Sequence, residues 1–280
     1  MGKKTTMDQF VNKIAIVTGG ASGIGRALCE VLGRRGAVVI VADIVKDGAE
    51  RTAATITQNK GWAQAKTVDV TRPEEVERLI SDTVSVYGRI DYLFNNAGIC
   101  IVGDTRDIDL ELWRRIVDVN LWGVIYGTTM AYRQMARQGF GHIVNTASLA
   151  GLISSPTFTS YATTKHAVVG LSRSLRAEAE DLGVKVSAVC PGFVRTGMFD
   201  SCIILKAKRE EANNQVNPRM ILEPSQAAQH ILRGVEQNQA LIVFPWYSHM
   251  IMWISRCFPS LMFALERKSV RDFRKMCDES

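Results

Sequence analysis

Histidine is scarce in this sequence, and the cysteines are not closely paired. The four histidines, at positions 142, 166, 230 and 249, show no ligand spacing such as H-E-x-x-H. The six cysteines include no C-x-x-C pair. We therefore predict that the protein holds no metal ion and that its thiols are reduced, as is usual in the cytosol.

The sequence also lacks a targeting signal and a clean membrane span. The N-terminal stretch MGKKTTMDQFVNK has no apolar segment that would form a signal peptide or an anchor. Near the C-terminus, Pro245, His249, Arg256 and Pro259 interrupt every window of about 20 residues, the length that a spanning helix needs. We expect a cytoplasmic protein.

No nucleic-acid-binding pattern accompanies the basic charge of the chain. The formal net charge is +6 and the pI is near 9.0, but arginine-rich, zinc-finger and aromatic RNA-binding patterns are missing. We predict no nucleic-acid partner. The excess basicity either helps to attract an anionic small molecule or reflects the C-terminal tail.

The chain does contain enough apolar material for a large core, since 46% of its 280 residues are hydrophobic. Short β-branched runs alternate with longer helical patterns. This order predicts an α/β fold, a doubly wound parallel sheet of about seven strands flanked by helices, with ligands at the carboxyl ends of the strands. We predict one main domain over residues 1–245 and an apolar-then-basic helical extension over 246–280.

The predicted strands cover residues 13–20, 37–43, 63–70, 90–98, 142–148, 185–192 and 240–244. The predicted helices cover residues 24–35, 46–60, 73–87, 109–137, 156–182 and 224–238. Pro73 and Pro224 are expected in the first turns of their helices.

A glycine-rich turn follows the first predicted strand. TGGASGIGRAL places Thr18, Gly19, Gly23 and Gly25 between that strand and a helix. Glycines permit a tight turn and close approach of the backbone to a pyrophosphate, and the helix N-terminus offers free N–H groups. The position within a strand–helix–strand unit predicts dinucleotide binding in the main domain.

Asp43 ends the second predicted strand, about 20 residues beyond the glycines. An acidic group at this point can bind both ribose hydroxyls of the adenosine, whereas it would repel a 2′-phosphate, and Ile44 supplies no neighbouring base. We therefore predict NAD as the cofactor. The alternative is an ordinary strand-end aspartate that caps the next turn.

Tyr161 and Lys165 lie four positions apart in a predicted helix, with Ser148 a short loop upstream. Such spacing places both side chains on one helical face, which by itself is more often packing than chemistry. For Ser148 the plain alternative is a strand-end cap, and for Asn120 a side chain that satisfies nearby backbone groups.

Together these motifs resemble the short-chain dehydrogenase/reductase family, from about Lys13 to Thr196. TGGASGIG resembles the family's cofactor loop, NNAG (95–98) its fourth-strand motif, and the Ser…Tyr-x-x-x-Lys set its catalytic group. The resemblance implies a Rossmann fold, a Ser148–Tyr161–Lys165–Asn120 site, and a homodimer or homotetramer built on the helices 109–137 and 156–182.

The resemblance also implies a set of cofactor contacts. Besides Tyr161 and Lys165, they are Gly19, Ser22, Gly23, Ile24, Gly25, Asp43, Asp69, Val70, Asn96, Ala97, Gly98, Pro191, Gly192, Val194 and Thr196.

The chemistry of the Tyr161–Lys165 pair follows from charge. The pKa of free tyrosine is near 10, too high for a base at neutral pH. A lysine ammonium about 4 Å away would stabilise the phenolate by roughly 4 kcal/mol at an effective dielectric constant near 20. We expect this to lower the tyrosine pKa toward pH 7, with desolvation opposing it. Ser148 would hydrogen-bond the substrate oxygen, and the resemblance implies that Asn120 holds a water near Lys165 for proton relay.

Two segments are less regular than the rest. Residues 197–223 are predicted to form a mobile substrate lid, or else a plain surface loop. Apolar side chains near the predicted site favour an apolar secondary alcohol or ketone; they are Cys100, Ile101, Val102, Leu149, Leu152, Ile153, Phe158, Phe193, Met198 and Phe199.

The segment from Leu241 onward is rich in aromatic residues and methionine and then basic. It either packs on the pocket or on a second subunit, or it lies on an anionic membrane.

The main functional hypothesis is an NAD-dependent oxidoreductase that transfers hydride between the cofactor and a secondary alcohol or ketone. Three alternatives stay open: an NADP-dependent carbonyl reductase, a nucleotide-sensing regulator without turnover, and a peripheral membrane protein. The intact Ser148–Tyr161–Lys165 set argues against the regulator.

Overall fold

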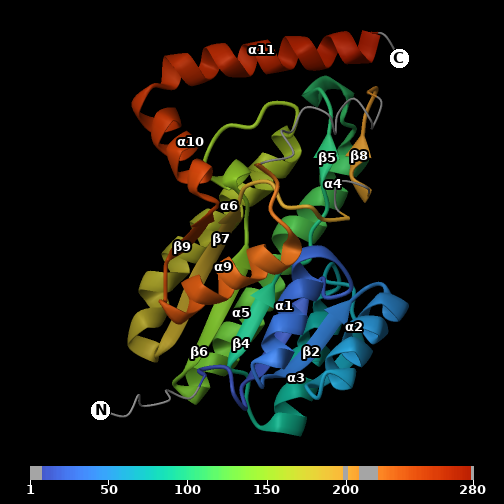
Figure 1. Cartoon of the computed structure of the whole chain (residues 1–280), viewed down its shortest axis with the longest axis vertical. Helices are drawn as coiled ribbons and strands as arrows, with labels where there is room; N and C mark the ends of the chain where they lie inside the picture. Colours follow the sequence, from blue (N-terminus) through green and yellow to red (C-terminus); the bar gives the residue numbers. More distant parts are fainter. Residues whose placement is uncertain (1–7, 198–200, 208–219, 279–280) are drawn as a thin grey trace.

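A computed structural model of the chain describes residues 8–197, 201–207 and 220–278. These residues form a sheet of seven parallel strands with helices on both faces and two further helices at the C-terminal end (Figure 1). The strand order is β3-β2-β1-β4-β6-β7-β9. The predicted doubly wound fold is therefore confirmed.

The strands of this sheet are β1 Ile14–Thr18, β2 Val38–Asp43, β3 Trp62–Thr67, β4 Tyr92–Asn95, β6 Gly141–Thr146, β7 Val184–Pro191 and β9 Leu241–Phe244. Strand β1 pairs with β2 on one side and with β4 on the other. The order of strands reverses between these two neighbours, which opens a crevice at the carboxyl ends of β1 and β4.

Two apolar layers separate the sheet from its helices. One face carries α1 Gly23–Arg34, α2 Lys46–Gln58 and α9 Pro224–Glu236, whose buried leucines and isoleucines form a continuous core with β1 and β2. The other face carries α3 Pro73–Tyr87, α5 Gly123–Gln138 and α6 Thr159–Ala179. Helices on both faces explain why most of these strands are apolar throughout rather than alternating.

Local signals in the sequence fix several helix ends. Pro73 and Pro224 are the first residues of α3 and α9, as predicted. Helix α9 also has a capping box, in which Glu223 and Gln226 bond each other's backbone N–H groups. Gly88 ends α3 with a φ of 75°, a conformation that glycine adopts without strain.

The helix predicted over 109–137 is interrupted. Helix α4 covers Leu110–Val117, a π-helical segment covers Asp118–Trp122, and α5 follows directly. Val117 and Gly123, which flank the π segment, have α-helical backbone angles, so the helix continues on both sides, and the periodicity of the sequence did not reveal the wider turn. Such segments are frequent at functional sites.

A second, two-stranded sheet was not predicted. Strand β5 Ile101–Val102 pairs in parallel with β8 Ile203–Ile204. This pairing brings part of the predicted lid, 197–223, beside the loop that follows β4. Residues 198–200 and 208–219 of that lid, including Met198 and Phe199, lie outside the described residues.

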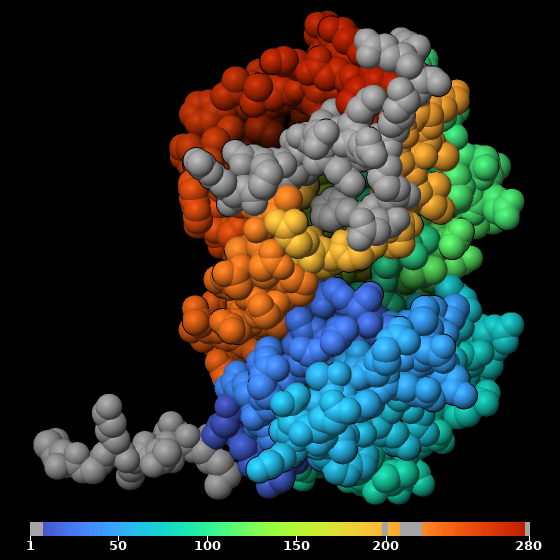
Figure 2. Space-filling view, turned by 45° about the vertical axis from the view of Figure 1, so that its right-hand side comes forward, coloured from blue at the N-terminus to red at the C-terminus, as the bar shows by residue number. Residues whose placement is uncertain are grey.

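The C-terminal extension forms two helices, α10 Trp246–Cys257 and α11 Pro259–Asp278. In Figure 1, α10 leads away from β9 and α11 crosses the end of the molecule that lies opposite the N-terminus. In Figure 2 the same helices, in red, form the upper edge above α9. Among the described residues, no helix combines the length and the apolar character that a bilayer crossing requires.

Candidate active site

The glycine loop after β1 adopts a conformation that other residues would resist. Gly19 and Gly23 have φ angles of 68° and 53°. A Cβ added at Gly25 would lie 2.1 Å from the carbonyl oxygen of Gly19, and one added at Gly19 would lie 2.9 Å from Ala97 Cα. The loop therefore packs backbone against backbone beside the crevice.

The N-terminus of α1 meets this loop without a side-chain cap. Ser22 occupies the N-cap position but makes no capping hydrogen bond within the described residues, and the first turn carries no acidic residue. Its N–H groups and the positive end of the helix dipole therefore suit an anion such as a pyrophosphate. Ile24 packs against the apolar core between the sheet and helices α1, α2 and α9, and this contact anchors the turn.

Asp43 stands at the end of β2 with both carboxylate oxygens engaged by backbone donors. The N–H of Ala21 donates to Oδ2 and the N–H of Val45 donates to Oδ1, each at 2.9 Å. The strand-end aspartate thus caps the turn, as the alternative prediction had it, and it also reaches the glycine loop. Ile44 and Val45 beside it are uncharged and are 62% and 55% exposed, and the next residue, Lys46, is paired with Glu50 at 3.9 Å.

The NNAG motif is tied to the end of β1. The Thr18 hydroxyl accepts hydrogen bonds from the N–H groups of Asn96 and Ala97, at 3.0 and 3.1 Å. Asn95 is buried and donates to Asn145 Oδ1 at 2.9 Å. These bonds hold the loop that leads to Gly98 directly against the glycine turn.

The loop after β3 carries Asp69 and Val70, two of the predicted cofactor contacts. Asp69 Oδ1 accepts hydrogen bonds from the N–H and the hydroxyl of Thr71, at 2.9 and 2.8 Å. Val70 lies against the start of α5, because a Cβ added at Gly123 would fall 2.9 Å from a Val70 methyl group. Both residues sit at the same carboxyl edge of the sheet as Asp43.

Asn120 lies in the π segment and is fully buried. Its Nδ2 donates to the carbonyl of Ile99 at 2.9 Å, and its Oδ1 accepts from the Ile99 N–H at 2.8 Å. The side chain therefore satisfies local backbone, the plainer of the two predicted roles. A Cβ added at Gly98 would lie 3.2 Å from Asn120 Oδ1 and 3.6 Å from Lys165 Nζ, which places the amide beside the lysine.

Helix α6 brings Tyr161 and Lys165 to one face, as the spacing predicted. Lys165 Nζ lies 5.5 Å from the centroid of the Tyr161 ring and donates a 2.9 Å hydrogen bond to the carbonyl of Thr146, the last residue of β6. Ser148 caps a 3₁₀ turn, Leu149–Gly151, by accepting from the Ala150 N–H, and its hydroxyl also hydrogen-bonds Tyr161. The three side chains converge.

Burial controls the protonation of this group. It raises the pKa of Tyr161 above the ordinary value, and the hydrogen bond with Ser148 acts in the opposite direction. Burial also lowers the pKa of Lys165 to about 8. The expected lowering of the tyrosine pKa by the lysine is therefore not met in the protein alone, because the cost of burying a phenolate is larger.

The loop after β7 closes the site on its other side. The N–H of Gly192 donates to the carbonyl of Phe244 at 2.7 Å, directly after Pro191. Val194 is buried and bridges to Leu222. Thr196 reaches the glycine loop, since its Cβ would lie 3.1 Å from a Cβ added at Gly23.

Sequence reasoning missed the residues that support this loop. Tyr247 of α10 accepts from the N–H of Phe193 at 3.0 Å and donates to the carbonyl of Met220 at 2.8 Å. A Cβ added at Gly192 would lie 2.7 Å from the hydroxyl oxygens of both Tyr247 and Ser248. Both residues follow Pro245 in a stretch whose aromatic composition indicated packing in general but no particular partner.

An apolar cluster borders Tyr161. Cys100, Val102, Cys202 and Phe273 are buried together, with Phe158 and Tyr161 partly buried against them. Cys100, Val102 and Phe158 were predicted near the site. Cys202 and Phe273 were not, because β8 and α11 bring them in from distant parts of the sequence.

Of the other predicted apolar neighbours, one also borders Tyr161 and one does not. Ile101 belongs to a second buried cluster, with Ile108 and Ile116, and Tyr161 packs against this cluster as well. Leu152 packs with Val168 and Val169 on the side of α6 that faces α10 rather than Tyr161.

Comparisons with known proteins identify the family of this chain. A profile of the short-chain dehydrogenase family matches residues 13–203. The chain is 36% identical to a cyclohexanol dehydrogenase from Acinetobacter over 198 residues, which cover 70% of this chain and 79% of that relative. It is 33% identical to a meso-2,3-butanediol dehydrogenase from Serratia marcescens, with 79% of this chain and 86% of the relative covered.

A solved structure gives the same result for the fold. A short-chain dehydrogenase/reductase from Burkholderia phymatum, determined in complex with NAD, superimposes with a TM-score of 0.82. It is 27% identical in sequence, and the match covers 91% of this chain and 96% of that protein.

Proposed function

Because this chain belongs to the short-chain dehydrogenase/reductase family, we propose that it is an NAD-dependent oxidoreductase that interconverts an apolar secondary alcohol and its ketone. The observation that carries this proposal is the convergence of Ser148, Tyr161 and Lys165 at the mouth of the crevice beside the glycine loop. The alternative of a regulator without turnover would not require this set.

The residues around the crevice fit a dinucleotide. The pyrophosphate would bind at the amino end of α1, where Gly19, Gly23 and Gly25 permit the tight turn and the close backbone packing that present the N–H groups of this helix end. Asn96 to Gly98 would line the ribose region, and Asp69 with Val70 the adenine. Pro191, Gly192, Val194 and Thr196 would hold the nicotinamide side.

A bound nicotinamide supplies the acceptor or donor of hydride. The protein controls the proton that accompanies it. When the alcohol is oxidised, the Tyr161 phenolate takes the proton of the substrate hydroxyl, and when the ketone is reduced the Tyr161 hydroxyl gives its proton to the substrate oxygen. Ser148 donates a hydrogen bond to the substrate oxygen and stabilises the charge that develops there.

Lys165 connects the tyrosine with the cofactor. Its hydrogen bond to the Thr146 carbonyl uses one of the three ammonium donors and fixes the position of the lysine side chain. The two remaining donors would bind the hydroxyls of the nicotinamide ribose. Asn120 holds Ile99 and the adjacent Gly98 in place and stands beside Lys165. A water held there would carry protons between Lys165 and solvent.

We propose NAD over NADP because Asp43 is held at the ribose edge by two backbone donors. A 2′-phosphate would meet this carboxylate at close range, and the neighbouring exposed residues, Ile44 and Val45, carry no compensating charge. The structural neighbour crystallised with NAD supports the same choice.

The substrate is proposed to be apolar because Cys100, Val102, Phe158 and Phe273 surround the approach to Tyr161. Cyclohexanol dehydrogenase and meso-2,3-butanediol dehydrogenase, the relatives named above, act on small secondary alcohols by their names. The residues 197–223 remain our proposed lid over this approach.

Two partner interactions belong to the proposal. One is a homodimer or homotetramer built on α4–α5 and α6, which the exposed Trp122, stacked on the partly buried Tyr126, supports. The other is a peripheral membrane contact through α10 and α11, which their exposed aromatic and basic residues support.

The test is turnover. Purified protein is titrated with NADH and with NADPH by fluorescence, and then assayed with NAD and a panel of secondary alcohols at the nicotinamide absorbance. We expect tighter NADH binding and NAD-dependent oxidation of at least one apolar secondary alcohol. Binding without turnover on any alcohol or ketone would instead support the regulator.

A further inference from the structure

Helix α11 turns one of its faces toward the body of the protein. Its buried and partly buried residues recur every three or four positions, so they lie along one side of the helix. They are Met262, Glu266, Val270, Phe273, Met276 and Cys277. The residues between them are exposed, and α11 therefore packs on the protein along this single stripe.

Two polar side chains attach this stripe to two different loops. Glu266 accepts a hydrogen bond from the hydroxyl of Ser154, in the loop that leads into α6. Arg274 forms an ion pair with Asp104, in the loop after β5, at 2.7 Å. Glu266 and Arg274 are eight positions apart, which corresponds to about 12 Å of helix. Helix α11 therefore bridges the loop before Tyr161 and the loop after β5.

Phe273 lies between these two attachment points and reaches the neighbourhood of Tyr161. Its side chain is 3% exposed and is buried in one cluster with Cys100, Val102 and Cys202, against which Tyr161 packs. The other three members come from the segments at β5 and β8. Phe273 is the buried residue that α11 contributes, so its ring closes this cluster from the side of the C-terminal helix.

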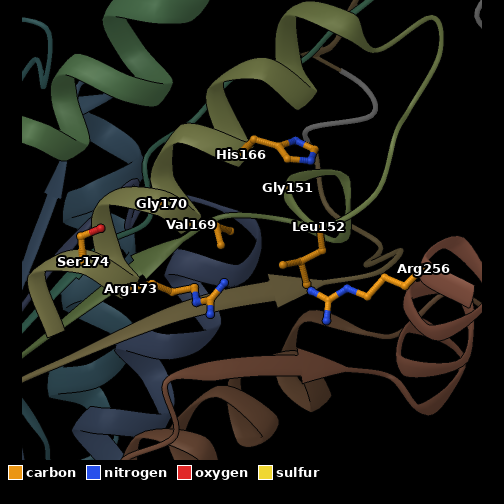
Figure 3. A pocket seen from close by; sticks show the side chains of 8 residues that line it. All are labelled: Gly151, Leu152, His166, Val169, Gly170, Arg173, Ser174 and Arg256. Atoms are coloured by element: carbon orange, nitrogen blue, oxygen red, sulfur yellow. The ribbon is translucent and has the colours of Figure 1, made fainter. Parts of the chain in front are cut away.

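Helix α10 serves a different part of the molecule. Its Tyr247 supports the loop after β7, and its Arg256 lies beside Leu152 in a pocket on the side of α6 that faces α10 (Figure 3). Neither Tyr161 nor Phe273 lines that pocket. Of the two C-terminal helices, α11 is therefore the one that reaches the apolar approach to Tyr161.

We propose that Phe273 is a specificity-determining residue, whose ring forms the outer wall of the substrate site, admits compact apolar secondary alcohols and excludes those that carry a further ring. The proposal deepens the proposed function and rests on it, since the substrate is taken to bind beside Tyr161. Helix α11 lies beyond residues 13–203, which match the family, so this wall belongs to the chain's own C-terminal extension. If Phe273 only packed α11 on the protein, removal of its ring would leave the choice of substrate unchanged.

The experiment uses a substrate that fits the space left by the ring. Phe273→Ala removes one phenyl ring, and 4-phenyl-2-butanol differs from 2-butanol by one phenyl ring. Burial of such a ring changes an equilibrium by about ten- to hundredfold. We expect Phe273→Ala to raise the ratio of kcat/KM for 4-phenyl-2-butanol to that for 2-butanol by at least about tenfold.

Two further variants control for folding and for the helix itself. Phe263→Ala is the matched control, because Phe263 belongs to the same helix but is 61% exposed, and it should change the ratio by less than about twofold. Phe273→Leu keeps an apolar side chain without the ring and should shift the ratio in the same direction by a smaller factor. NADH titration reports whether each variant is folded. An unchanged ratio in the Phe273 variants that bind NADH normally, or an equal shift in Phe263→Ala, would overturn the proposal.

Arg274 is a positioning residue in this scheme, because it holds α11 against Asp104. Arg274→Gln should raise the same ratio by about two- to fivefold, as the loss of a partly exposed ion pair allows. Arg274→Lys keeps the charge and should restore most of the original ratio. Arg271→Gln, which removes an exposed arginine from the same helix, should leave the ratio unchanged. Equal effects of Arg271→Gln and Arg274→Gln would remove this role from the ion pair.

Binding measurements separate this inference from the proposed reaction. The dissociation constants of both alcohols for the NADH complex, followed by NADH fluorescence, require no turnover, and their ratio should shift in Phe273→Ala as the kcat/KM ratio does. A shifted binding ratio without turnover in any variant would refute the reaction and retain the role of Phe273. Turnover with an unchanged ratio would retain the reaction and refute the role of Phe273. Failure of Phe273→Ala to gain affinity for 4-phenyl-2-butanol would also refute it.

Discussion

The ammonium of Lys165 lies 5.5 Å from the ring centroid of Tyr161, one turn away in α6, and is tied to the Thr146 carbonyl. Both side chains belong to one helix, so their relative position depends on helical geometry and little else. The bond to Thr146 then fixes the pair against the end of β6. Removal of the tyrosine hydroxyl should therefore lower turnover and leave cofactor affinity unchanged.

Tyr161→Phe should therefore lose activity and keep its cofactor. We expect kcat for alcohol oxidation to fall by about 10²- to 10⁴-fold, the usual contribution of a general acid or base, with NADH affinity changed by less than about twofold. Tyr87→Phe is the matched control, because Tyr87 packs on Trp62 at the far end of α3. Near-normal turnover of Tyr161→Phe on a true substrate would remove the assignment.

The direction of the tyrosine pKa shift predicts the pH dependence. Since burial raises the pKa of Tyr161, the phenolate needed for oxidation is a minor species at neutral pH and increases about tenfold per pH unit. Burial lowers the pKa of Lys165 to about 8, so the ammonium is present below that pH and is lost above it. The logarithm of kcat/KM for oxidation should rise with pH, with a slope near one, up to about pH 8.

Ketone reduction uses the protonated tyrosine and should show no such rise. Its kcat/KM should stay level through neutral pH and decline only in alkali. Steady-state rates in both directions, measured in the same buffers, test the pair of profiles. A level profile for oxidation over the acid side would show that a group other than Tyr161 takes the proton.

Asn120→Ala should weaken the protein as well as the reaction. The amide makes two hydrogen bonds to Ile99 from a fully buried position, and their loss leaves buried backbone groups unsatisfied. We expect the free energy of unfolding to fall by about 2 kcal/mol or more, together with lower turnover. Urea unfolding measures the first effect. Asn59→Ala, which removes an exposed amide bonded to Thr55, should change it by less than about 0.5 kcal/mol.

Asp43→Ser tests the choice of cofactor. Removing the carboxylate takes away hydrogen bonds to the ribose and the repulsion of a 2′-phosphate, so NADH should bind about tenfold more weakly and NADPH more tightly. Asp47→Ser, an exposed change of equal charge in the first turn of α2, should leave both affinities unchanged. Equal losses in both variants would mean that Asp43 acts only through net charge.

The sheet and its helices could be predicted because their signals are local. Apolar runs such as 37–43 and the prolines at 73 and 224 determine elements within a few residues, and the order of strands and helices then restricts the topology. Tyr161 and Lys165 met in space for the same reason, since one helix carries both.

Other features depend on contacts between distant segments. Strands β5 and β8 are two residues each and pair across about a hundred positions, so neither carries a periodic signal. Phe273 reaches the Tyr161 cluster only because α11 crosses the end of the molecule. The π segment around Asn120 and the effect of burial on the tyrosine pKa likewise require coordinates, because both are set by packing from several elements.

Two glycines of this chain should respond to alanine in opposite ways. A Cβ at Gly25 would lie 2.1 Å from the Gly19 carbonyl oxygen and 2.6 Å from Asn96 Nδ2, and the first of these is backbone that cannot turn aside. Gly25→Ala should therefore abolish NADH binding and lower the free energy of unfolding by about 1–3 kcal/mol. At Gly170, inside α6, no neighbouring atom of the described part of the chain lies within 4 Å of the added Cβ. Gly170→Ala should instead stabilise the protein by up to about 1 kcal/mol with NADH affinity unchanged, because alanine favours the helix. Thermal unfolding and NADH fluorescence on both variants make the comparison, and normal NADH binding by Gly25→Ala would refute the placement of the pyrophosphate at this turn.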